Sequence, residues 1–240
     1  MTIRLTALAV GAAFAALAGA ANAAPAAADG FNTNNAGHFT LTTRLTDVSS
    51  DANNAIRVPA LGVNTGLKVD VSDSVVPTVG IDYYFTNNVS AELILGSSFH
   101  SIKAKGVTAI PTAVPAGTAI NTKIQSTWTL PPTLTAKYHF APNSQINPYV
   151  GGGVGAILFF GGGGKNGFKV KLPANAGLVL QAGVDVATQG PWSVNVDVKK
   201  EFFNTKAKVN AANDPLAPVD LNSSVDLDPW IVSVGVGYKF

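Results

Sequence analysis

The 240-residue chain contains no cysteine, and charged residues make up only 12% of it. The absence of cysteine excludes thiol catalysis, disulfide bonds and cysteine-based metal sites. The formal net charge is +2 and no basic run occurs, so the sequence predicts no nucleic-acid partner. Beyond the N-terminal region no apolar run reaches the length of about 18 residues that a transmembrane helix requires, which excludes helical membrane spans.

The first 23 residues have the features of a secretory signal peptide. Arg4 supplies the positive charge, Leu5 to Leu17 form a short apolar stretch, and Ala21-Asn22-Ala23 is a small-x-small cleavage site. An N-terminal anchor helix is the alternative, although the apolar stretch is short for one. We therefore expect cleavage after Ala23, a periplasmic segment over residues 24–36 and a folded domain over residues 37–240.

The remaining chain repeatedly alternates apolar and polar residues. In the segment 230–240 (WIVSVGVGYKF), every second residue from Trp230 to Phe240 is apolar, and the intervening residues are mostly small or polar. A period of two places successive side chains on opposite faces of a β-strand. Similar segments make eight predicted strands in all, at residues 37–48, 75–86, 89–96, 133–140, 148–160, 175–188, 192–199 and 230–240.

The connections between these segments alternate in length. Strands two and three, four and five, and six and seven are joined by brief turns, whereas the other connections are long and include 104–119 and the expected flexible loop 161–164. Outer-membrane barrels combine short periplasmic turns with long external loops. The prediction is an all-β fold, an eight-stranded antiparallel transmembrane β-barrel in the bacterial outer membrane. A secreted lipocalin-like barrel is the alternative, but its charges would face outward.

Nearly every charged residue of the predicted strands lies on the face opposite the apolar band. Eight strands enclose a narrow interior that side chains fill, so we expect the inward charges to pair into a polar plug rather than to conduct ions. These residues are Arg44, Asp82, Glu92, Lys137, Asp185, Asp197, Lys199, Glu201 and Lys239.

The three histidines do not predict an active site. His38 and His139 are expected near the periplasmic rim and His100 near the external one, so no base, nucleophile and orienting group converge. The sequence predicts no enzyme, no catalytic residue, no cofactor and no metal site.

Several ordered strings carry a family resemblance. They are Trp128-Thr129-Leu130-Pro131-Pro132-Thr133-Leu134, Asn147 to Gly153 (NPYVGGG), Gln181 to Asp185 (QAGVD), Leu227-Asp228-Pro229-Trp230 and the closing Gly237-Tyr238-Lys239-Phe240. With them, essentially the whole mature chain resembles the OmpW family of outer-membrane proteins. The resemblance implies an apolar channel for uptake of small hydrophobic molecules, blocked toward the periplasm and releasing its ligand sideways into the bilayer.

Two groups of residues are candidates for that channel. Pro131 and Pro132 cannot donate ladder hydrogen bonds, so they predict either a local gap in the wall or merely the end of pairing at the rim, and the resemblance favours the gap. Leu130, Phe159 and Phe203 are expected to line an apolar pocket at the external end, although each could instead belong to an interface belt.

The resemblance also implies that Tyr238 and Phe240 form the signal read by the outer-membrane assembly machinery. The other expected partners are outer-membrane lipid and lipopolysaccharide. The competing function is a structural or surface-interaction barrel whose loops contact host, phage or lipopolysaccharide. An apolar path through the lumen would favour uptake, whereas paired charges along its full height would favour the anchor.

Overall fold

The computed structural model describes residues 36–49, 55–58, 63–109, 115–164, 169–171, 174–188, 190–210 and 220–240. The predicted signal peptide and residues 24–35 of the predicted periplasmic segment lie outside the described residues. Among the described residues, no helix is long and apolar enough to cross a membrane.

The described residues form fourteen strands, and all their pairings are antiparallel. The strands are β1 (Phe39–Ser49), β2 (Ala55–Val58), β3 (Val63–Val71), β4 (Ser74–Tyr84), β5 (Val89–Gly96), β6 (Ser98–Val107), β7 (Ala119–Leu130), β8 (Thr133–His139), β9 (Ile146–Gly164), β10 (Lys169–Lys171), β11 (Asn175–Ala187), β12 (Trp192–Asn210), β13 (Asp220–Leu227) and β14 (Trp230–Lys239). Eight of them pair in the closed ring β1-β4-β5-β8-β9-β11-β12-β14. The predicted eight-stranded antiparallel barrel is confirmed.

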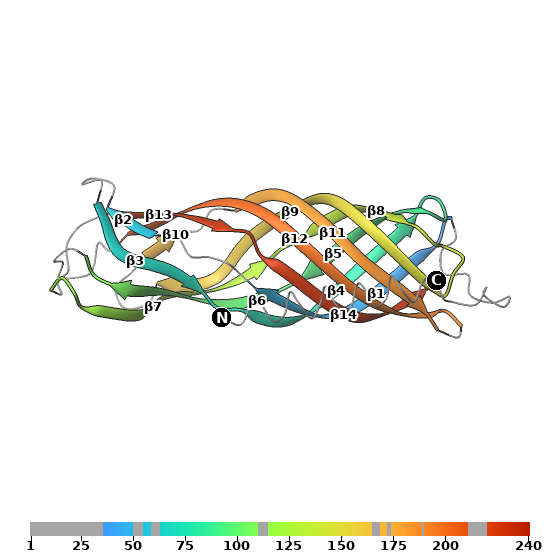
Figure 1. Ribbon diagram of the computed structural model, residues 1–240, viewed down its shortest axis with the longest axis horizontal. Coiled ribbons are helices and arrows are strands. Elements are labelled where there is room, and N and C mark those ends of the chain that lie inside the picture. The colour runs from blue at the N-terminus through green and yellow to red at the C-terminus, as the bar shows by residue number, and fades with distance from the viewer. Residues whose placement is uncertain are drawn as a thin grey trace.

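The barrel is elongated, and its strands slant steeply around the long axis (Figure 1). The short turns β4–β5, β8–β9 and β11–β12 lie at the end where the C-terminus is found, which is the periplasmic end. Strands β2, β3, β10 and β13 lie at the opposite, external end, and β9 and β12 run through both parts of the barrel.

The external strands correct the prediction of long loops. Within the expected loop 104–119, β6 continues to Val107 and β7 begins at Ala119. The expected flexible loop 161–164 is the end of β9, where Gly162, Gly163 and Gly164 pair with β7. A backbone ladder forms without side chains, so a glycine run that shows no alternation can still complete a strand.

The outer surface carries two aromatic belts with an aliphatic band between them. The periplasmic belt contains Phe39, Phe85, Phe140, Trp192 and Phe240, and the external belt contains Phe99, Trp128, Phe160, Phe202 and Trp230, all of them exposed. At about 3.4 Å per residue and a tilt of about 40°, the stretch from Trp230 to Phe240 spans a height of ~25 Å. That height matches the apolar band of an outer-membrane barrel.

The last strand closes the barrel against the first, as predicted. The register between β1 and β14 runs from Thr40 opposite Lys239 to Ser49 opposite Trp230. Beyond the strand, the backbone N–H of Phe240 donates to the carbonyl of Phe39 at 2.9 Å. The ladder thus extends to the last residue, so the closing strand has no free end at the periplasmic rim.

Candidate functional site

A network of polar side chains, called here the polar plug, fills the periplasmic half of the barrel. Its members are Arg44, Asp82, Glu92, Lys137, Tyr149, Gln181, Asp185, Asn195, Asp197 and Lys199. They come from seven strands around the ring, β1, β4, β5, β8, β9, β11 and β12. Except for Asp185, which is half-buried, all of these residues are almost inaccessible to solvent.

Opposite charges meet at the centre of the polar plug. The Arg44 guanidinium forms an ion pair with Glu92, and its Nε donates to Asn195 at 2.6 Å. Lys137 Nζ lies 3.0 Å from Asp82 and 3.6 Å from Glu92. Each cation therefore has a carboxylate partner, and the predicted pairing of inward charges is confirmed for these groups.

Neutral side chains complete the polar plug. The Gln181 amide donates to both Glu92 and Asp197, each at 2.7 Å, and the Tyr149 hydroxyl donates to Asp197 at 2.7 Å. Lys199 forms an ion pair with the same Asp197. Buried polar groups are costly unless they are hydrogen-bonded, so these bonds make a stable, closed floor.

Toward the external end the interior contains an apolar cluster, beside buried polar side chains such as Thr65, His100 and Gln125. Its buried members are Ile56, Val69, Ile102, Ala104, Ile124 and Phe203, and Leu67, Val71, Ile157 and Phe159 pack against them. The cluster draws on the external strands β2, β3, β6 and β7 and on the upper parts of β9 and β12. A molecule that approached from outside would therefore meet apolar side chains before it reached the polar plug.

Pairing is interrupted on one side of the barrel, between these two regions. The β5–β8 ladder ends with Ile94 opposite Thr133, and the β6–β7 ladder resumes with Ser98 opposite Thr129. The intervening segments, 95–97 and 130–132, are called here the wall gap, because the described ladders include no pair between them. On the other side, β9 stays attached, since the Ala156 N–H donates to the carbonyl of Pro132 at 2.9 Å.

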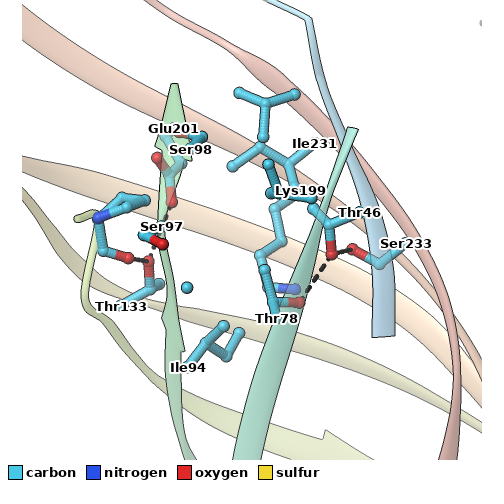
Figure 2. A pocket seen from close by; sticks show the side chains of 14 residues that line it. Thr46, Thr78, Ile94, Ser97, Ser98, Thr133, Lys199, Glu201, Ile231 and Ser233 are labelled. Carbon is cyan, nitrogen blue, oxygen red and sulfur yellow. Dashed lines mark hydrogen bonds between the residues drawn. The ribbon is translucent and has the colours of Figure 1, made fainter. Parts of the chain in front are cut away.

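A hollow of about 450 Å³, open space at its mouth included, lies at the same height (Figure 2). Its lining consists of Thr46, Val48, Val76, Thr78, Ile94, Gly96, Ser97, Ser98, Pro131, Thr133, Lys199, Glu201, Ile231 and Ser233. Ser97 and Pro131 belong to the wall gap, and Ser97 is exposed on the barrel surface. The hollow thus adjoins the wall gap.

The predicted site residues lie in different parts of the barrel: the hollow, the wall gap and the apolar cluster. Pro131 lines the hollow, and Pro132 lies beside it in the wall gap. Phe203 is a buried member of the apolar cluster, and Phe159 packs against it. Their neighbours Phe202 and Phe160 are exposed on the outside, as the alternation predicts.

Leu130 does not join the apolar cluster. It is half-buried and pairs with Leu158, which is 40% exposed, next to the exposed pair Trp128 and Phe160. This corrects its assignment to the interior pocket: Thr129 is buried, so alternation turns Leu130 toward the lipid-facing side.

Sequence reasoning missed one pairing of chemical interest and, except for Pro131, the residues that line the hollow. Ser90 Oγ lies 3.0 Å from His139 Nε2, although the two are far apart in the sequence. Both side chains are fully buried, and neither lines the hollow. Glu201 was expected in the polar plug, but it lines the hollow instead, where Thr133 of β8 is its hydrogen-bond partner.

The closed ring, the aromatic belts and the polar interior define an outer-membrane β-barrel protein. A profile of the OmpW family matches residues 35–240, and the chain belongs to that family. It is 37% identical over 196 residues to the outer-membrane protein y4mB of Sinorhizobium fredii, covering 77% of this chain and 79% of that protein. It is 31% identical over 166 residues to outer membrane protein W of Escherichia coli, covering 66% and 69% of the two chains.

A solved structure agrees with this assignment. The outer membrane protein OprG from Pseudomonas aeruginosa superposes with a TM-score of 0.76 at 26% identity, over 87% of this chain and 98% of that one. The resemblance expected from the sequence strings is therefore confirmed, together with the location in the outer membrane.

Proposed function

We propose that this barrel takes up small hydrophobic molecules and releases them sideways into the outer membrane. The ligand arrives at the external end, passes along the apolar cluster, occupies the hollow and leaves through the wall gap. The observation that carries the proposal is the position of the hollow, which lies above the polar plug and is lined by Ser97 and Pro131 of the wall gap.

Two features support release through the wall rather than into the periplasm. The polar plug is buried and held by ion pairs at its centre, so a molecule cannot continue downward without breaking them. Unpaired backbone groups in hydrocarbon cost several kcal/mol each, but a proline has no N–H to leave unpaired. Pro131 and Pro132 therefore reduce the cost of keeping this part of the wall open.

The same features favour a role in uptake over a role as a structural anchor or as an enzyme. Paired charges fill the periplasmic half of the lumen, whereas the external strands contribute the apolar cluster and uncharged polar side chains such as Thr65 and Gln125 to the interior. Ser90 and His139 are enclosed in the barrel without access to the hollow, which supports a non-enzymatic role. Membrane lipid and lipopolysaccharide are then the surroundings of the barrel rather than its substrates.

A reversible cross-link across the wall gap tests the proposal. The chain contains no cysteine, so Ser97→Cys combined with Pro131→Cys gives two unique thiols that a short bis-maleimide or oxidation can bridge. We expect the bridged protein to lose most of its uptake of a radiolabelled alkane in intact cells. Opening a disulfide bridge with reductant should restore it.

The matched control is Leu93→Cys with Leu134→Cys, a pair that already faces each other in the β5–β8 ladder. Bridging these residues adds the same chemistry to a closed part of the same wall, so uptake should not change. Normal uptake by the Ser97–Pro131 bridged protein, with the bridge verified by mass spectrometry, would contradict release through the wall gap.

The apolar cluster provides a second prediction. Phe159→Ala combined with Phe203→Ala should lower the initial rate of alkane uptake severalfold, because the ligand loses apolar contact area on the way to the hollow. Leu158→Ala serves as the control, since Leu158 is exposed to lipid on the outer face. Equal uptake rates for the double variant and for Leu158→Ala, at equal amounts of assembled protein, would show that the ligand does not pass along the apolar cluster.

A further inference from the structure

Glu201 occupies the boundary between the two halves of the interior. The inward face of β12 carries Asn195, Asp197, Lys199, Glu201 and Phe203 in turn. The first three belong to the polar plug, and Phe203 belongs to the apolar cluster. Glu201 is therefore the last polar side chain on this strand before the apolar region, and it lines the hollow at 2% exposure.

The carboxylate of Glu201 has unusually few partners for so buried a charge. Its Oε1 accepts one hydrogen bond, from Thr133 Oγ1 at 3.1 Å. Lys199, two residues earlier on the same face, forms its ion pair with Asp197. Among the side chains that the structure describes, no cation lies within ion-pair distance of Glu201. Burying an unpaired carboxylate is costly, so this position favours a ligand that can supply the missing donor.

The charge of the interior points to the same kind of ligand. Among the described residues, the inner face carries five carboxylates and four cations. The carboxylates are those of Asp82, Glu92, Asp185, Asp197 and Glu201. The cations are those of Arg44, Lys137, Lys199 and, at the periplasmic rim, Lys239. The inner face thus carries one more acidic side chain than basic ones, so a cationic head group matches it better than an anionic one.

Polar and apolar side chains share the lining of the hollow around Glu201. In Figure 2, Glu201, Ser98 and Thr133 lie on one side, while Lys199, Thr78 and Ile231 lie on the other. Ile94 and Ile231, with Val48 and Val76, supply apolar lining beside these polar groups.

We propose that the hollow is a head-group site for amphiphiles whose polar end donates hydrogen bonds, above all a primary ammonium. Glu201 accepts from the head, and the chain lies along the apolar lining toward the wall gap. This inference rests on the proposed function and names its preferred substrates, short alkylamines before alcohols of equal length, with carboxylates disfavoured.

Four eight-carbon compounds test the preference. Radiolabelled octane, octanol, octylamine and octanoate are given to intact cells with and without the protein, and the protein-dependent initial rates are compared. For the unaltered chain we expect octylamine to exceed octanol and octane, with octanoate slowest. Glu201→Gln should lower the octylamine-to-octane ratio about tenfold, the scale of one hydrogen bond to a charged group.

The control variant is Asp70→Asn, which makes the same acid-to-amide change in an exposed ion pair with Lys105, outside the hollow. Its four rates should match those of the unaltered chain. If the Glu201→Gln protein does not assemble, Glu201→Leu takes its place in the test, because an apolar side chain has no charge to bury. It too should abolish the octylamine preference while octane still enters.

The outcomes separate the two proposals. If the protein does not accelerate octane, the proposed function fails. If octane is accelerated but octylamine is no faster, or if both Glu201 variants change all four rates by one common factor, the head-group site is wrong and uptake itself stands.

Discussion

Replacing Arg44 with methionine is expected to lower the free energy of unfolding by about 3–5 kcal/mol, the usual cost of removing one partner from a buried ion pair. Arg44 and Glu92 have side chains only 1% and 0% exposed. The substitution leaves the Glu92 carboxylate buried with Lys137 at 3.6 Å and the Gln181 amide as its remaining partners. It also removes the hydrogen bond to Asn195.

Urea unfolding of the protein in lipid vesicles, followed by tryptophan fluorescence, measures this loss. Lys105→Met is the matched control, because the Lys105–Asp70 pair has side chains 44% and 43% exposed. Such exposed pairs contribute about 0–1 kcal/mol. The double variant Arg44→Met with Glu92→Leu should recover much of the stability, since no unpaired charge is left. A similar loss for Arg44→Met and Lys105→Met would show that the polar plug does not hold the barrel together.

Removal of Phe240 is expected to prevent most of the protein from reaching the outer membrane. The residue pairs its N–H with Phe39 and places its ring 4.9 Å from that of Tyr238, which lies 4.8 Å from Trp192. The shortened chain loses the last bond of the closing ladder and the end of this aromatic row. By resemblance to the family, it also loses the residue that the assembly machinery reads.

The amount of heat-modifiable protein in the outer-membrane fraction checks this expectation. Phe85→Ala is the control, since Phe85 is an equally exposed aromatic residue of the same belt outside the closing strand. The few molecules that do insert without Phe240 should take up alkane at a normal rate per molecule, because the residue lies far from the hollow. Normal membrane levels of the shortened protein would contradict the assembly role.

The ring of eight strands could be predicted from the sequence because each strand is a local pattern. Trp230 to Phe240 shows which face is apolar without reference to any other strand. Once the strands are assigned, the barrel rule turns Arg44 and Glu92 inward, and their pairing follows from the narrow lumen. The aromatic pairs Phe159-Phe160 and Phe202-Phe203 could likewise be divided between inside and outside by alternation alone.

The site depends on offsets between strands, which a single sequence does not show. A register shift between Ile102 and Lys103 leaves Ile124 of β7 as an extra residue, and another between Thr127 and Trp128 leaves Gly161 of β9 as one. Such shifts decide which side chains of a strand face the lumen. The isolation of Glu201 depends on Lys199 pairing with Asp197, a choice between neighbours on one strand face. The Ser90–His139 contact likewise joins strands that are separated in sequence.

The closed floor formed by the polar plug has a consequence for the cell as a whole. An open pore admits ions and polar toxins in proportion to its copy number, so its abundance is limited by the leak that it causes. The proposed route, sealed below by the polar plug and open to lipid at the wall gap, would add no aqueous connection between the two faces of the membrane. Under this proposal the copy number could follow the supply of hydrophobic molecules, without any loss of the permeability barrier to water-soluble compounds.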